Sequence, residues 1–134
     1  MTLTTAQLGF LAQGRWALVS TVGRSGGPQI SMVSYAWDDT AVVMSVRRAA
    51  VKWTNVLRDP RIAVTVTDDL HCLTLYGTAD CIERDPERET LTRTLQASLL
   101  PAHAVLLEQD FVNGLEAAGR VVIRLVPERA VGRI

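Results

Sequence analysis

Three cations gather at one point of this sequence, in the stretch MSVRRAAVKWTNVLRDPR from Met44 to Arg61. Arg47 and Arg48 end an apolar run typical of a strand, and Lys52 follows in the first turn of a predicted helix. Guanidinium and ammonium groups beside the free N–H groups of a first helical turn favour a phosphate or another anion. The same residues could equally form a solvated, arginine-rich helix start. Taken alone, they leave both interpretations open.

The predicted helix, from about Ala49 to Arg58, divides into two faces. Arg48, Lys52 and Asn55 fall at spacings of four and three, which places them on one polar face. We expect the other face to pack against a sheet; it holds Ala50, Trp53, Val56 and Leu57. As the largest apolar side chains, the tryptophans are predicted to be core residues: Trp16, Trp37 and Trp53.

The chain as a whole carries no excess of positive charge, since its 14 basic residues are balanced by 14 acidic ones. Proteins that coat nucleic acids or bind acidic membranes rely on a large positive excess, so neither partner is predicted. No apolar run approaches the roughly 20 residues of a membrane span, and the first residues do not resemble a signal peptide. Any anion site is therefore expected to be local.

The remaining reactive side chains predict neither a disulfide nor a metal site. Cys72 and Cys81 lie on one predicted strand at an odd spacing, so they face opposite sides about 30 Å apart and cannot pair. A reducing, cytoplasmic setting fits two free thiols best. His71 and His103 lack neighbours at metal-binding spacing and are predicted to be surface or loop residues.

The elements that must position these residues are mainly strands. We expect the order helix, three strands, helix, two strands, two helices and a final strand with a short extended piece. The predicted strands are Arg15–Val22, Gln29–Trp37, Ala41–Val46, Arg61–Thr67, His71–Ile82 and one from Arg120. The predicted helices start at a Thr4–Gln7 capping box, near Ala49, at Pro86 and at Glu108. Hairpin-linked strands in one domain over residues 1–134 favour an antiparallel barrel.

One short motif points to another function. The residues GRSGG, from Gly23 to Gly27, match the Gly-x-Ser-x-Gly pattern of a hydrolase nucleophile. That motif needs a helix directly after it, whereas Pro28 and a second strand follow here. A glycine-rich hairpin loop is the predicted structure.

Three segments, in this order, carry a family resemblance: STVGRSGGPQISMVSYAWDD, VVMSVRRAAVKWTNVLRDPRIAVTV and LTLYGTADCIERDPE. Their common features are the Gly-x-Pro strand start, the run from Lys52 through Asn55 to Asp59-Pro60-Arg61, and the strand from Tyr76 to Ala79. The set, from about Leu8 to Val131, resembles the FMN-binding split barrel superfamily that includes pyridoxamine 5′-phosphate oxidase. It looks closest to the small actinobacterial branch that uses the deazaflavin coenzyme F420.

The resemblance implies a fold, mainly β with short helices: an antiparallel split β-barrel that forms a homodimer with cofactor sites at the subunit interface. It also implies that Lys52 binds the cofactor phosphate, with Arg48 expected to reach the acidic tail of F420. The strand end that lines the same pocket comprises Ser45, Val46 and Arg47. The strand whose backbone follows the flavin-like ring contributes Ser31, Met32, Val33 and Ser34. The segment contributed by the partner chain is Leu73, Thr74 and Leu75.

The sequence departs from the family pattern in two places. Members of this branch often carry Asn where this chain has Met32, and a methionine cannot replace the paired hydrogen bonds of an amide. We therefore expect backbone groups to recognise the ring. True pyridoxamine oxidases have a longer C-terminal region that binds the substrate, and the final segment PERAVGRI is too short for it. Vitamin oxidation is therefore not expected.

The resulting hypothesis is an oxidoreductase that holds reduced F420 and passes a hydride to an electron-poor small molecule. The protein supplies position, charge and shelter from water. No side chain is identified as an acid or base, so the proton is expected from solvent or a bound water. FMN in the same pocket is the main alternative. A non-catalytic carrier of a flavin or deazaflavin, and a dimeric barrel without a ligand, also stay open.

Overall fold

The computed structural model describes residues 1–99 and 108–134, with side chains for residues 1–97 and 113–134. The predicted order of elements is confirmed. The strands are β1 (Trp16–Val22), β2 (Pro28–Trp37), β3 (Val42–Arg47), β4 (Arg61–Thr67), β5 (Cys72–Ile82), β6 (Arg120–Leu125) and β7 (Arg129–Arg133). The helices are α1 (Thr5–Gln13), α2 (Val51–Arg58), α3 (Glu87–Leu99) and α4 (Glu108–Ala117).

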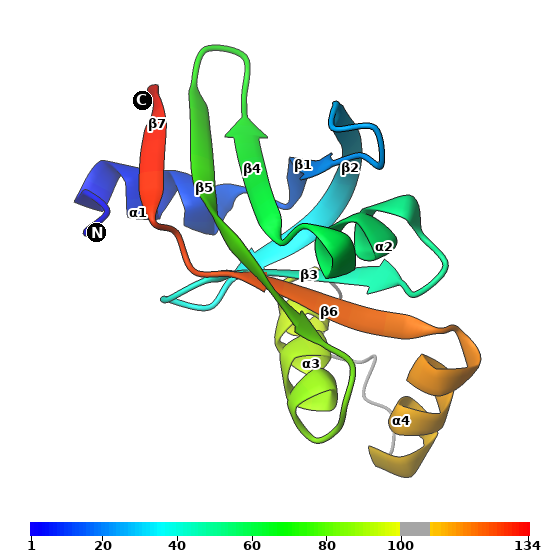
Figure 1. Ribbon diagram of the computed structural model, residues 1–134. Coiled ribbons are helices and arrows are strands. Elements are labelled where there is room, and N and C mark those ends of the chain that lie inside the picture. The colour runs from blue at the N-terminus through cyan, green and yellow to red at the C-terminus, as the bar shows by residue number, and fades with distance from the viewer. Residues whose placement is uncertain (100–107) are drawn as a thin grey trace.

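Six strands close into one antiparallel barrel (Figure 1). Their order is β4-β1-β2-β3-β6-β5, and pairing between β4 and β5 completes the ring. The long strand β5 serves two neighbours in turn, because its first part pairs with β4 and its last part with β6. The short strand β7 adds to the outer edge of β5. The predicted antiparallel split β-barrel is thus confirmed.

The interior of the barrel is filled by alternate residues of the strands, as the period of two requires. Leu11 of α1 and Trp53 of α2 belong to the same core. The Tyr35 hydroxyl donates a hydrogen bond to the Leu11 carbonyl oxygen at 2.6 Å, and burial raises the pKa of Tyr35 to about 12. The predicted Thr4–Gln7 capping box starts α1.

The prediction for the two faces of α2 is wrong in part. Asn55 is 2% exposed, and its side-chain amide donates to the Thr21 hydroxyl of β1 at 3.0 Å. Leu57, predicted to pack against the sheet, is 57% exposed. The error arises because α2 begins at Val51, so Arg48 precedes the helix and cannot define a face with Asn55. Asn55 instead ties α2 to the barrel.

Helix α3 lies outside the barrel, against β2, β3 and β6. A small second core forms there from Val43, Ile82 and Val122, with Leu91 of α3 packed against it. Helix α4 follows and leads through Gly119, whose φ of +62° suits a glycine, into β6. The two helices therefore cover the side of the barrel that contains β3 and β6.

Both cysteines are free. Within residues 1–99 and 108–134, no helix has the length and apolar character needed to cross a membrane.

Candidate functional site

A cavity of about 290 Å³ lies where β3 ends and α2 begins. Its lining residues are Trp16, Met32, Val33, Ser34, Ser45, Val46, Arg47, Ala50, Lys52 and Arg120. We call it the cation cavity, because three of these side chains are basic and none is acidic. A concave site with that composition attracts an anionic ligand.

The start of α2 adds to the positive character of the cation cavity. Ala50 occupies the N-cap position and has no side chain that could accept a hydrogen bond from the first turn. The Trp53 N–H already donates to the Ala50 carbonyl at 3.1 Å, so in the described structure the N–H groups of Val51 and Lys52 are the ones left for an outside acceptor. The helix dipole favours negative charge there. Lys52 stands in this turn, half-buried, and is the single lysine of the chain.

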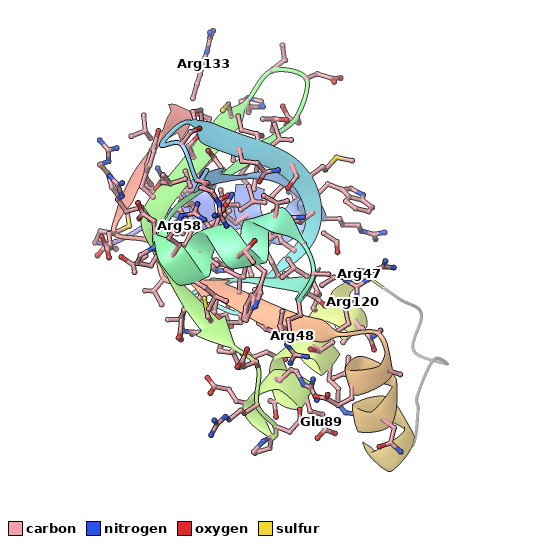
Figure 2. All side chains as sticks on the ribbon, turned by 45° about the vertical axis from the view of Figure 1, so that its right-hand side comes forward. Arg47, Arg48, Arg58, Glu89, Arg120 and Arg133 are labelled. Atoms are coloured by element: carbon pink, nitrogen blue, oxygen red, sulfur yellow. The ribbon has the colours of Figure 1, made fainter. Side chains whose placement is uncertain are left out.

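Arg47 and Arg120 stand directly opposite each other in the antiparallel ladder between β3 and β6. Figure 2 shows both at one end of the barrel, with Arg133 at the other. Like charges in such a pair repel unless an anion lies between them. Among the described side chains, no carboxylate forms an ion pair with Arg47, Lys52 or Arg120. A ligand that carries negative charge fits this arrangement.

The remaining wall of the cation cavity is apolar and open. Trp16 and Met32, from β1 and β2, are 59% and 65% exposed. The prediction that Trp16 is a core residue is therefore wrong. The pairing of β1 with β2 puts Leu18 opposite Met32, and both are exposed together with Ile30 on the outer face of the barrel. A planar ring could lie against this wall while its phosphate meets the cations.

The structure brings most of the predicted cofactor-binding residues together. Those that line the cation cavity are Met32, Val33, Ser34, Ser45, Val46, Arg47 and Lys52. Ser31 is a neighbour in β2 but lines no wall of it, and its buried hydroxyl has no hydrogen-bond partner in the described structure. Arg48 is exposed and lines no wall of it either. The roles assigned to these residues stay predictions.

The segment expected from a partner chain lies elsewhere on the barrel. Leu73 and Leu75 are fully buried in the core, so only Thr74 between them directs its side chain outward. Strand pairing continues the outer row from Met32 and Leu18 to Thr65 of β4 and then to Thr74. Thr74 therefore shares the outer face with the apolar wall of the cation cavity.

Sequence reasoning missed three lining residues of the cation cavity: Trp16, Ala50, which is the N-cap of α2, and Arg120. The alternation in WALVSTV shows two faces, but both begin with apolar residues and neither is marked as outer. Arg120 follows Gly119 at a strand start, which is a common helix-to-strand pattern. Its nearness to Arg47 depends on a strand pairing between distant parts of the chain.

A buried arginine lies behind the site. Arg88 of α3 is 1% exposed and donates to both carboxylate oxygens of Asp85, at 3.0 and 2.7 Å, and to Glu116 at 2.6 Å. Its hydrogen bonds lower the pKa of the Asp85 carboxyl. Arg88 also donates to the backbone carbonyl of Arg120 at 3.2 Å. These bonds fix the strand start that presents Arg120 to the cation cavity.

A larger cavity, of about 440 Å³, lies near the loop between β1 and β2, with Arg61 and Glu128 among its lining residues. Arg61 already forms an ion pair with Asp59 at 2.6 Å, and this guanidinium lowers the pKa of Asp59 to about 2. This cavity thus has a basic and an acidic lining residue, and the basic one already has a carboxylate partner. Size alone would favour it, but unpaired positive charge favours the cation cavity.

No group of three His, Cys, Asp or Glu residues that could hold a metal ion occurs in the described part of the chain. His71 lies in the turn before β5, where its ring bonds Asp68 at 3.1 Å. His103 lies outside the described residues. The expected absence of a metal stays a prediction.

Solved structures similar to this chain share its fold. A conserved hypothetical protein of Mycobacterium tuberculosis has a TM-score of 0.77 and 19% identity, over 98% of this chain and 85% of that one. A protein titled F420 reductase has a TM-score of 0.71 and 21% identity, over 96% and 98%. A Clostridium acetobutylicum protein related to general stress protein 26, of the pyridoxinephosphate oxidase family, has a TM-score of 0.72 and 14% identity, over 96% and 85%.

No curated protein matches the chain. The family model described as pyridoxamine 5′-phosphate oxidase matches residues 3–132, nearly the entire sequence. The barrel topology agrees with this match. The chain therefore belongs to the pyridoxamine 5′-phosphate oxidase family.

Proposed function

We propose that this protein is an oxidoreductase that binds reduced coenzyme F420 in the cation cavity, with FMN as the alternative occupant. The observation that carries the proposal is the set of Arg47, Lys52 and Arg120 in one cavity without a described carboxylate. Family membership and the F420 reductase among the similar structures support a flavin-like cofactor.

In this proposal Arg47, Lys52 and the first turn of α2 hold the phosphate, and the wall made by Trp16 and Met32 receives the ring. When bound, the reduced deazaflavin supplies a hydride to an electron-poor organic substrate. Among the described lining residues, no histidine or carboxylate could transfer a proton. The proton that completes the reduction is therefore expected from solvent or a bound water, while the protein orients the ring.

We further propose that a second copy of the chain covers the outer face defined by Trp16, Leu18, Ile30 and Met32. Four large exposed apolar side chains on adjacent strands form a surface that soluble proteins usually bury against a partner. Because Trp16 and Met32 also line the cation cavity, a partner here would stand beside the cofactor. Thr74, on the same outer row, is the residue it would contribute from the predicted segment.

Binding can be tested without measuring turnover. Lys52 is the only lysine, so an amine-acylating reagent followed by mass spectrometry reports on this side chain and the N-terminus separately. We expect F420 or FMN to protect Lys52 from acylation and to leave the N-terminus reactive. Equal labelling with and without either cofactor would contradict the phosphate site. Oxidation of reduced F420 that depends on an added electron-poor substrate then distinguishes an enzyme from a carrier.

The dimer is tested separately by a change at Ile30, which lies on the outer face but does not line the cation cavity. Size-exclusion chromatography with light scattering is expected to give the mass of a dimer for the natural chain. Ile30→Glu is expected to give a monomer, since a charge would have to be buried. A natural chain that is monomeric at micromolar concentration would exclude this proposal.

A further inference from the structure

A second cavity, of about 240 Å³, lies beside the cation cavity on the side of α3 and α4. We call it the helix cavity. Ser34, Ser45 and Arg120 line both cavities, so the two share a wall. The other lining residues of the helix cavity are Thr92, Leu95, Gln96 and Leu115.

Among the described residues that line the helix cavity, Arg120 is the only charged one. The serine hydroxyls and the Gln96 amide offer donors and acceptors, and two leucines give apolar contacts. Of the described lining residues, a positively charged ligand group would meet Arg120 and no compensating carboxylate. A polar chain that carries a negative charge fits the helix cavity better.

The number of cations exceeds what one phosphate needs. A phosphomonoester carries a charge of about −1.5 to −2 at neutral pH, and a phosphodiester carries less, so Arg47 and Lys52 together balance either group. Arg120 is a third cation, and it stands where the two cavities meet. The excess indicates a second negative group, placed beyond the phosphate.

The backbone around Arg120 is held on both sides. Arg88 donates to the Arg120 carbonyl at 3.2 Å, and the backbone N–H of Arg48 donates to the Gly119 carbonyl at 2.7 Å. Arg88 is in turn fixed by Asp85 and Glu116. The guanidinium of Arg120 therefore extends from a rigid base, which lowers the entropy lost when it binds a ligand.

We infer that Arg120 selects a cofactor whose phosphate is a diester that continues into the helix cavity and carries a carboxylate there. The inference rests on the proposed function and deepens it. F420 has such an extension, whereas FMN ends at its phosphate. Arg47 and Lys52 hold the phosphoryl group, and Arg120 binds the next negative group. Arg48, which lines neither cavity, does not take part.

Fluorescence titrations with three ligands test this assignment: F420, FMN, and the 5′-phosphate of the ribityl deazaflavin, which has the F420 ring but ends at the phosphate. Arg120→Ala is expected to weaken F420 binding about 10-fold or more and to change the affinity of the two monophosphates less than about 3-fold. Arg120→Lys, which keeps the charge, is expected to fall between Arg120→Ala and the natural chain. Arg84→Ala is the control, because Arg84 is exposed and lines neither cavity.

Thermal unfolding of each variant shows whether the barrel is intact. Equal weakening of all three ligands by Arg120→Ala would make Arg120 a phosphate residue and overturn the inference, as would no weakening at all. A natural chain that binds FMN as tightly as F420 would overturn the inference and leave the proposed function standing with FMN. A natural chain that binds none of the three would overturn both.

Discussion

The protein contains two clusters of basic side chains whose environments differ sharply. Arg88 is buried and bonded to Asp85, Glu116 and a backbone carbonyl. Arg47, Lys52 and Arg120 share a cavity in which no described carboxylate approaches them. A buried guanidinium with protein partners holds elements together. Cations gathered without protein partners repel one another and are explained by a ligand.

The two clusters are also connected, because Arg88 holds the backbone of Arg120. The paired cluster thereby positions one member of the unpaired cluster. Substitutions in the first are expected to act on stability, and substitutions in the second on binding. Each prediction below tests that division.

The largest effect is expected for Arg88→Ala. This change removes the bonds to Asp85 and Glu116, leaves the Arg120 carbonyl without its donor and opens a cavity. The free energy of unfolding should therefore fall by about 2–4 kcal/mol. Urea denaturation followed by circular dichroism measures it. Arg61→Ala, which breaks the exposed pair with Asp59, is the control and should cost far less. A similar loss in both variants would mean that burial does not distinguish the arginines.

Lys52→Ala should act on binding instead. We expect cofactor affinity to fall by about 1.5–3 kcal/mol, the range for a hydrogen bond to a charged group, with little change in unfolding free energy. Fluorescence titration and thermal unfolding of the same samples give both quantities. Lys52→Arg keeps the positive charge and should retain part of the affinity. An unchanged affinity in Lys52→Ala would remove Lys52 from the phosphate site.

Low pH should reduce the contribution of the Arg88–Asp85 ion pair to the stability of the protein. The pKa of Asp85 is lowered in the folded protein by Arg88, so its contribution to stability is present above the ordinary carboxyl pKa and is lost as the pH falls through the folded value. Arg88→Met, which keeps much of the volume, lacks this contribution. The stability difference between Arg88→Met and the natural chain should therefore narrow below about pH 4. A difference that stays constant down to pH 2.5 would contradict the ion pair.

The smallest effect concerns the repulsion between Arg47 and Arg120. In the protein without a cofactor, a double-mutant cycle with Arg47→Gln and Arg120→Gln should show an unfavourable coupling of about 0.2–1 kcal/mol. Added inorganic phosphate should reduce it, since the anion screens the two charges. Urea denaturation with and without phosphate measures both values. A favourable coupling without phosphate would show that the two guanidinium groups do not repel.

Much of the fold could be predicted because its signals are local. Alternating residues identified the strands, and the Thr4–Gln7 pair marked the start of α1. The cation-rich end of β3 was also visible, since Arg47 and Lys52 are close in sequence. Faces were harder. Trp16 is exposed and Asn55 is buried, against the usual preference of both residue types, because the packing of neighbouring elements decides the matter.

What the sequence determined by itself is the set of elements and the gathering of Arg47 and Lys52 where a strand passes into a helix, because hydrogen bonding and side-chain periodicity act over a few residues. The pairing of Arg47 with Arg120, and the wall that joins the two cavities, were decided only by the tertiary structure. These features depend on the register between β3 and β6, and closure of the barrel as a whole sets that register.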